Sequence, residues 1–263
     1  MIPYLAVFIV SLLTAGLTMY SGFGLGTLLL PVFALFFPVE VAVGATAVVH
    51  GANNLFKVTL VGRHADKGLV LAFGVPAILA AFVGAAALGL VAHLEPLATY
   101  QLGPRTAVVT PVKLAVGILM AFFALFELLP RFRNLKFQKR HLPVGGLLSG
   151  FFGGFSGHQG ALRSAFLVKT GVATEAFVGT NAVIGFAVDA MRIATYAGMA
   201  LLAGASQPIG AEQWPLITTG IAAAFCGVLI GTRFLHKVTM RTVQTLTGVL
   251  LLGIAVVIGA GVI

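Results

Sequence analysis

The sequence predicts an all-α integral membrane protein, built as two inverted repeats that each combine a glycine-broken helical hairpin with three transmembrane helices. Only 9% of the residues are charged, whereas a soluble domain carries roughly 25%. Hydrophobic residues make up 59% of the 263 positions, more than one globular core could hide from water. Apolar segments of span length recur along the chain, and its second half repeats its first. We therefore expect lipid to surround most of the chain and no sizeable soluble domain.

The excess of basic residues does not indicate a nucleic-acid partner. The formal net charge is +9, but the Lys and Arg residues lie mostly in loops and form no basic face with interleaved aromatic residues. The single cysteine, Cys226, stands in an apolar stretch and is interpreted as a buried structural thiol. No basic segment precedes the first apolar run, so we expect no cleaved signal peptide and assign residues 3–20 to the mature protein.

The first inverted repeat is predicted to cover residues 1–130. Its hairpin, 3–37, is apolar but interrupted by the glycine cluster S-G-F-G-L-G at 21–26. Such a cluster breaks a helix inside an otherwise hydrophobic segment. The three spans expected after it are 41–61, 68–92 and 107–129.

A basic connection, 131–143, follows and is predicted to be cytoplasmic, because Lys and Arg concentrate in cytoplasmic loops. The segment 198–213 contains neither Lys nor Arg and is predicted to lie outside. Successive spans cross the membrane in alternating directions. Counted from the cytoplasmic connection and from the outside segment, they place both the N-terminus and the C-terminus outside. The basic residues of the connection are Arg131, Arg133, Lys136, Lys139 and Arg140, and the other basic turns contain Arg63, Lys67, Lys237 and Arg241.

The second inverted repeat is predicted over 144–263. Its hairpin, 144–169, breaks at S-G-H-Q-G and has arms too short to cross a hydrocarbon core of roughly 30 Å. It starts at the cytoplasmic connection and ends at cytoplasmic Lys169, so it enters and returns from one side. Either break could instead be a kink between two full helices, which would leave the halves inverted. The spans expected after it are 175–197, 214–234 and 243–263.

Alignment of the chain with itself supports the repeat. An offset of 135 aligns residues 11–61 with 146–196 without a gap and gives ten identities, where composition alone gives roughly four. Both glycine breaks share a Ser-Gly pair in this alignment. Asn54 falls on Asp189, and Lys57 falls on Arg192. An odd number of crossings per half makes the two copies inverted.

The two breaks predict an anion site near the membrane midplane. Irregular backbone at that depth is tolerated only where protein buries it or where it lines a polar cavity. The helix leaving each break points its N-terminal amides at the midplane, a position suited to an anion. The break residues expected to bind the anion are Ser21, Gly22, Gly24, Gly26, Thr27, Ser156, Gly157, His158 and Gln159.

Polar residues inside the helices complete the candidate site. Arg163 is expected at a depth where an unpaired charge costs roughly 3 kcal/mol, so it either binds the anion or contacts hairpin carbonyls. Asp189 and Arg192 form an i, i+3 pair that is most economically a neutralised ion pair. His158 either couples a proton to transport or is a structural histidine, and His50 and Lys113 are weaker candidates. The further binding candidates are Asn53, Asn54, Lys57, Asn181, Asp189 and Arg192.

The sequence contains no motif for several common kinds of binding or catalytic site. The chain has no CxxC set, no HExxH and no phosphate-binding G-x-x-x-x-G-K, so we expect no metal, nucleotide or other cofactor. No nucleophile stands in a recognisable motif, which argues against an enzyme.

Stretches in both halves of the chain carry a family resemblance. The run S-G-F-G-L-G-T-L-L-L-P-V-F at 21–33 and the second-half stretches G-F-F-G-G-F-S-G-H-Q-G and T-E-A-F-V-G-T-N-A resemble the TauE/SafE family of membrane transporters. The resemblance implies an exporter of sulfite, organosulfonates or related sulfur anions such as thiosulfate, in the bacterial cytoplasmic (inner) membrane. The positions that match its motifs are Ser21 to Thr27, Thr46, Ser156 to Gly160 and Asn181.

The residues and the resemblance together predict a secondary transporter that works by alternating access, with its anion between the two hairpin tips. A passive anion channel is the alternative, and a structural membrane subunit is a weaker one. The partners expected are a small sulfur oxyanion or organosulfonate and the lipid bilayer. Glycine-rich spans such as 227–231 suit close helix packing, within the chain or in a homodimer.

Overall fold

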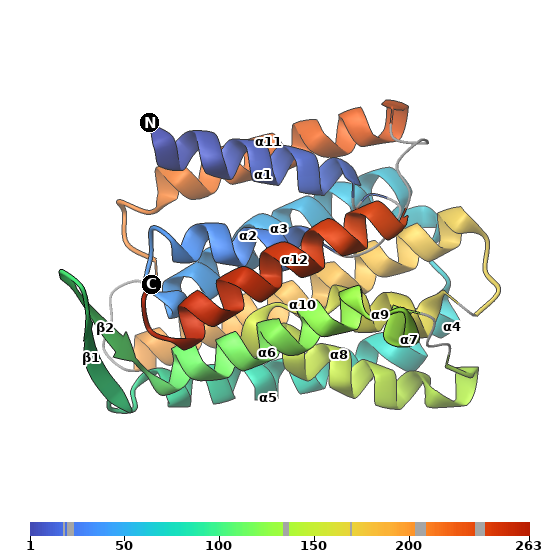
Figure 1. The fold of residues 1–263 in the computed structure, drawn as a ribbon. Coiled ribbons are helices and arrows are strands. Elements are labelled where there is room, and N and C mark those ends of the chain that lie inside the picture. Colours follow the sequence, from blue (N-terminus) through green and yellow to red (C-terminus); the bar gives the residue numbers. More distant parts are fainter. Residues whose placement is uncertain (18, 20–23, 134–136, 169, 203–208, 235–239) are drawn as a thin grey trace.

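The computed structural model describes residues 1–17, 19, 24–133, 137–168, 170–202, 209–234 and 240–263. It is a helical bundle, which confirms the all-α membrane class (Figure 1). Both termini lie at the end of the bundle that carries a small β-hairpin, and α4 (Lys67–Leu69) and α7 (Pro130–Arg133) lie at the other. Among the described helices, those long and apolar enough to cross a membrane are Lys67–Ala92, Pro111–Leu128, Thr174–Leu202 and Trp214–Gly231.

The first half contains two short helices and three long helical segments. Gly24 directly precedes the second short helix, and Pro38 precedes the first long one. A π-helical turn, Val70–Gly74, continues α4 into the next helix, where Pro76 stands in the first turn. The bounds are α1 (Ile2–Leu17), α2 (Leu25–Ala34), α3 (Val39–Val61), α5 (Val75–Ala92) and α6 (Pro111–Leu128).

The second half has the same kinds of elements in the same order. Its two short helices are separated by the turn at Gly157, and Gly171 lies between the second of them and the long helix that follows. The bounds are α8 (Leu142–Ser156), α9 (Gly160–Leu167), α10 (Thr174–Leu202), α11 (Trp214–Phe234) and α12 (Met240–Gly259).

The prediction that a span begins at 107 is wrong, because residues 98–109 form a β-hairpin of β1 (Ala98–Leu102) and β2 (Arg105–Val109). The strands pair antiparallel around a turn at Gly103. Tyr100 donates a hydrogen bond to the Ala260 carbonyl at 2.6 Å, which ties the hairpin to the C-terminal end. Helix α6 starts only at Pro111, where the Thr110 side chain accepts from the Lys113 amide.

Three smaller expectations also differ from the structure. Helix α10 continues to Leu202 instead of ending at 197, and α12 ends at Gly259 instead of 263. Cys226 is exposed on α11, so the interpretation as a buried thiol is wrong. Exposed apolar residues are ordinary on a helix whose solvent is lipid.

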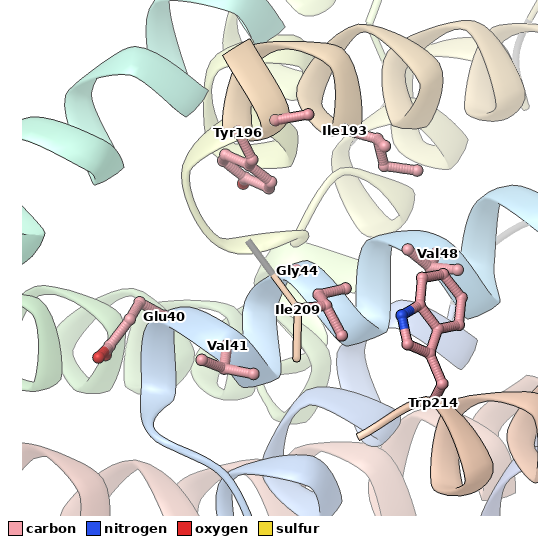
Figure 2. A pocket seen from close by; sticks show the side chains of 9 residues that line it. Glu40, Val41, Gly44, Val48, Ile193, Tyr196, Ile209 and Trp214 are labelled. Carbon is pink, nitrogen blue, oxygen red and sulfur yellow. The ribbon is translucent and has the colours of Figure 1, made fainter. Parts of the chain in front are cut away.

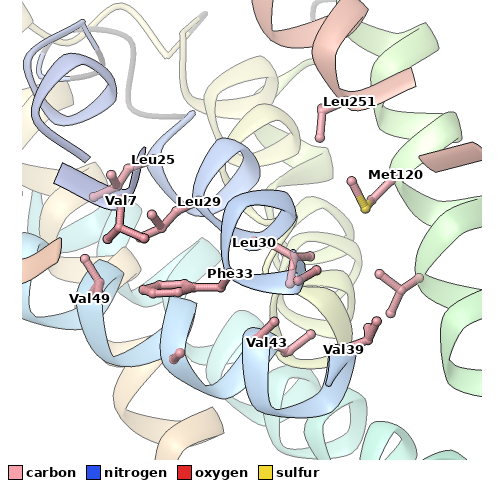
Figure 3. Packing of buried hydrophobic residues seen from close by; sticks show 14 of the residues in the cluster. Val7, Leu25, Leu29, Leu30, Phe33, Val39, Val43, Val49, Met120 and Leu251 are labelled. Carbon is pink, nitrogen blue, oxygen red and sulfur yellow. The ribbon is translucent and has the colours of Figure 1, made fainter. Parts of the chain in front are cut away.

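The packing places one short helix at the centre of the bundle. Helix α2 contacts α1, α3 and α12, and its Leu25, Leu29 and Phe33 are almost fully buried. Figure 3 shows these side chains between Val7 of α1 and Val49 of α3. A helix that is apolar on all sides is stable where neighbours cover every side. Helix α2 is thereby held as a short element within the bundle.

Helices of the first half pair with helices of the second half. Helix α3 packs against α10, α6 against α12, α5 against α8, and α1 against α11. Helices α5 and α8 approach closely at small residues, since a Cβ on Gly150 or Gly154 would meet the carbonyl groups of Ala77 and Ala81. This packing brings the second break next to α10.

Candidate functional site

The start of α2 lies against the second glycine break inside the bundle. Helix α8 ends at Gly157, whose φ of 82° is left-handed, and α9 starts at Gly160. Gly26, in the first turn of α2, lies so close that a Cβ there would be 3.4 Å from the Gly157 carbonyl oxygen. The same Cβ would be 3.4 Å from the His50 ring of α3. The start of α2, with buried Gly24 and Thr27, therefore faces the turn of the second break.

Two of the predicted break residues, Ser21 and Gly22, lie outside the described residues.

The Asp189 carboxylate is the centre of a buried hydrogen-bond network. Its Oδ2 lies 2.6 Å from Nδ1 of His50 and accepts from Nδ2 of Asn54 at 3.0 Å. Its Oδ1 accepts from Nε2 of Gln159 at 2.9 Å and from Nε of Arg192 at 3.0 Å. One carboxylate thus joins α3, the second break and α10. All its donors are buried, so each needs this partner.

Arg192 is fixed by the residues around it. Its Nη2 lies 2.9 Å from Oδ1 of Asp189, so the expected i, i+3 ion pair is present. Its Nη1 donates to the Gly153 carbonyl at 3.2 Å and lies 2.9 Å from where a Cβ on Gly157 would be. The Arg192 guanidinium therefore binds the C-terminal end of α8, and Asp189 neutralises the charge of the guanidinium.

Arg163 points from α9 toward α10. Its Nε donates to Oδ1 of Asn181 at 2.8 Å, and its Nη1 donates to Oε1 of Gln159 at 2.7 Å. Gly185 makes room for this arrangement, because a Cβ there would be 3.1 Å from the Arg163 Nη1 and 2.7 Å from the Asn54 Nδ2. These two hydrogen bonds, to the side-chain oxygens of Asn181 and Gln159, orient the guanidinium.

The face of α3 that carries Thr46, His50, Asn53 and Lys57 adds unmet polar groups. Within the described part of the chain, neither amide atom of Asn53 has a hydrogen-bond partner. The only salt bridges found among the described residues involve Asp189, so none of them reaches Lys57. Both side chains are at most 6% exposed. Lys57 is close enough to Arg163 for their charges to repel each other.

His158 turns toward α6. Its ring stacks on Phe123 with centroids 5.2 Å apart, and its Nδ1 lies 3.0 Å from Oγ of Ser156. Its Nε2 has no partner among the residues that the structure describes. These contacts direct the His158 ring to α6, and neither His158 nor Ser156 is among the hydrogen-bond partners of Asp189 in the described part of the chain.

Six of the predicted residues therefore belong to one hydrogen-bond network. Asn54, Gln159, Asp189 and Arg192 share one network, which Arg163 and Asn181 extend. His50, which was not among the primary candidates, is a member that sequence reasoning undervalued. Its position four residues before Asn54, on the same helical face, is the signal that could have included it.

An apolar cavity of about 260 Å³ lies near this cluster and contains none of the predicted residues. Figure 2 shows it between α3 and α10, with Gly44, Ile193, Tyr196 and Trp214 in its wall. Tyr196 lies one helical turn after Arg192 on α10 and donates a hydrogen bond to the Gly154 carbonyl. The cavity is suited to apolar groups, whereas the charged cluster is enclosed by side chains.

Among the described residues, no group of three or more His, Cys, Asp or Glu side chains could hold a metal ion. The charged cluster instead combines amide and cationic donors, which are typical of sites for oxyanions.

Comparison with known proteins supplies a family. The model of the sulfite exporter TauE/SafE family matches residues 7–258, nearly the whole chain. Comparison with curated proteins and with solved structures gives no match. The family consists of transporters and not of enzymes. The chain is accordingly a multi-pass membrane protein that belongs to the sulfite exporter TauE/SafE family.

Proposed function

We propose that this protein exports sulfite or a related small sulfur anion by alternating access, and that the anion binds between the two breaks beside Arg163 and Lys57. The observation that carries the proposal is the group of buried cationic and amide donors near the second break. Lys57, Arg163 and Arg192 lie there with the Asn53 amide, and all four side chains are at most 6% exposed. Buried cationic and amide donors of this kind are typical of sites for oxyanions.

Buried hydrogen-bond donors without a partner among the described residues support the same position for the anion. The Asn53 amide is buried without a partner among the described residues, and buried polar groups of this kind are rare outside functional sites. An oxyanion would accept hydrogen bonds from both Asn53 and Lys57. The start of α2, whose amides face the same region, would add its positive dipole end.

The packing supports two inverted repeats, 1–130 and 144–263, joined by 131–143. The offset of 135 relates α1 to α8 and α3 to α10, and the order of the elements relates α5 to α11 and α6 to α12. The contact of α5 with α8 is then the counterpart of that of α11 with α1. The contacts of α3 with α10 and of α6 with α12 join counterparts directly. Two such halves, rocking around a fixed central site, are the usual basis of alternating access.

We place the protein in the bacterial inner membrane with both termini outside. An inside-negative potential then assists export, at about 2.3 kcal/mol per charge per 100 mV. The large burial of Arg163 and Arg192 supports a gated site instead of an open pore, because neither side chain is more than 1% exposed.

A thermal-shift titration of the detergent-purified protein tests the proposal. Sulfite and thiosulfate should raise the melting temperature, because binding stabilises the folded state by mass action. The variant Arg163→Gln should lose the shift. Arg105→Gln, in the exposed hairpin, is the control and should keep it. If no sulfur anion shifts the wild type, the proposed function is wrong and a structural subunit becomes the better reading.

Transport into vesicles separates an exporter from a channel. Everted proteoliposomes that hold a membrane potential should accumulate labelled sulfite with saturable kinetics. Flux that grows linearly with concentration and never saturates would contradict alternating access.

A further inference from the structure

We infer that the apolar cavity between α3, α10 and the start of α11 is a second binding site, for one acyl chain of a bilayer phospholipid whose headgroup carries a primary amine. The chain would lie in the cavity, and the amine would pair with the Glu40 carboxylate at its mouth. This site is separate from the proposed anion site, because Asn53, Lys57 and Arg163 are not among the residues that line the cavity.

The cavity is open space with an apolar wall. Its volume is about 260 Å³, and a Cβ on Gly44, which lines it, would meet nothing within 4 Å. The hydroxyl of Tyr196 already has a partner, since it donates to the Gly154 carbonyl. Among the described residues that line the cavity, only Glu40 is charged. A cavity of this kind excludes water and takes apolar groups.

The depth of the cavity matches one leaflet of a bilayer. On α3, its lining residues run from Glu40, in the first turn, to Val48 (Figure 2). On α10, the lining residue farthest from the helix end at Leu202 is Ile193. Val48 and Ile193 each lie nine positions from that end of their helix, a depth of about 13 Å at 1.5 Å per residue. The hydrocarbon of one leaflet is about half of a core of roughly 30 Å, so an acyl chain has the length that the cavity needs.

The mouth of the cavity lies where a headgroup would be. Glu40 also borders a larger hollow of about 540 Å³, whose wall includes Lys113 and the C-terminal Ile263. The mouth is therefore at the end of the bundle that carries both termini (Figure 1). Trp214, the first residue of α11, also lines the cavity, and tryptophan is enriched at membrane–water interfaces.

The charges at the mouth indicate the kind of headgroup. Glu40 is exposed, and both salt bridges found in the described part of the chain involve Asp189 instead. A primary ammonium donates up to three hydrogen bonds and pairs with a carboxylate. Lys113, in the wall of the larger hollow, suits the headgroup phosphate. Phosphatidylethanolamine has both groups, whereas phosphatidylglycerol has the phosphate alone and would leave Glu40 without a partner.

Quenching of tryptophan fluorescence by brominated lipid provides the test. Trp214 is the single tryptophan of the chain and lies in the wall of the cavity, so it reports on the occupant directly. The full-length protein is reconstituted into vesicles of equal parts phosphatidylethanolamine and phosphatidylglycerol, with bromine on the acyl chains of one lipid or the other. Brominated phosphatidylethanolamine should quench Trp214 more strongly. The preference in binding should be about twofold to fivefold, the range that one exposed ion pair contributes.

Two pairs of variants separate the chain from the headgroup. Gly44→Leu fills the cavity and should lose the difference between the two lipids, while Gly198→Leu, at another open position that does not line the cavity, should keep it. Both substitutions favour a helix, because leucine has the higher helix propensity. Glu40→Gln should equalise the two lipids. Glu95→Gln removes an exposed carboxylate outside the cavity wall and should keep the preference.

Equal quenching by the two brominated lipids in the wild type would overturn the inference, because Trp214 would then sense only the surrounding bilayer. A preference that persists in Gly44→Leu would equally place the lipid elsewhere. If a bromoalkanesulfonate quenches the wild type but not Gly44→Leu, while the two lipids quench alike, the cavity holds the organic tail of a substrate and the assignment to a phospholipid is wrong.

Discussion

Asn54 donates a hydrogen bond of 3.0 Å to Asp189, and these two residues stand 135 positions apart, the offset at which the two halves of the chain align. Small residues make the contact feasible. A Cβ on Gly51 would be 3.2 Å from the Asp189 Cβ, and one on Gly185 would be 2.7 Å from the Asn54 amide nitrogen. Counterparts in two related halves touch where the axis that relates them passes. The hydrogen bond therefore supports a two-fold axis through the α3–α10 crossing.

The fold should need a carboxylate at this crossing. Whether α10 carries it at position 189 or α3 carries it at position 54 should matter less. Asp189→Asn should destabilise the fold by about 3–5 kcal/mol, because Arg192 is left as an uncompensated buried charge. The double variant Asn54→Asp/Asp189→Asn returns a carboxylate to the same contact and should recover part of the loss. Thermal unfolding of both variants in detergent measures the effect. A double variant less stable than Asp189→Asn alone would argue against this view of the network.

The turn at Gly157 should tolerate no side chain. Gly157→Ala meets a left-handed φ of 82° and places a Cβ 2.9 Å from the Arg192 Nη1. Gly171 is a matched control, since its φ is 77° and a Cβ there would meet nothing within 4 Å. Each substitution carries a backbone cost of roughly 1–2 kcal/mol, and only the first also displaces Arg192. Gly157→Ala should therefore lower both the melting temperature and the sulfite-induced shift more than Gly171→Ala does.

The contact of α5 with α8 should depend on the absence of a side chain at Gly154. A Cβ there would collide with the Ala81 carbonyl, so Gly154→Ala should cost about 1–3 kcal/mol, as overpacking does. Gly198→Ala on α10 adds a methyl group where nothing lies within 4 Å, and its stability should stay close to wild type. Thermal unfolding of the two variants side by side is the measurement. If both variants unfold at the same temperature, α5 and α8 can move apart without a loss of stability, and the prediction is wrong.

Orientation can be read from two engineered cysteines in a Cys226→Ser background, which removes the exposed native thiol. Gln101→Cys lies in the exposed β-hairpin, and Arg140→Cys lies in the exposed end of the basic connection. A membrane-impermeant maleimide added to intact cells should label position 101 and leave position 140 unlabelled until the membrane is opened. The reverse pattern would show that the termini lie inside. Figure 1 shows β1, the strand that contains Gln101, and α7, at the start of the basic connection, at opposite ends of the bundle.

Short-range signals made much of the fold predictable. Long apolar segments gave the positions of the helices, because lipid requires each crossing to satisfy its own backbone. The breaks at Ser21 to Gly26 and Ser156 to Gly160 were visible because glycine clusters interrupt those segments. The β-hairpin at 98–109 was missed for the same reason: its Val and Ala residues also read as part of an apolar span.

The sequence by itself thus determined the lipid solvent, the all-α membrane class and the residue types of the candidate site. Only the tertiary structure decided which of those residues share a partner. His50 and Gln159 are 109 positions apart, yet both bind Asp189, because the packing of α3, α8 and α10 converges there. Likewise, Arg163 of α9 donates to Asn181 of α10 because these two helices pack together. Contacts between distant segments set these partners, and no local pattern in the chain records them.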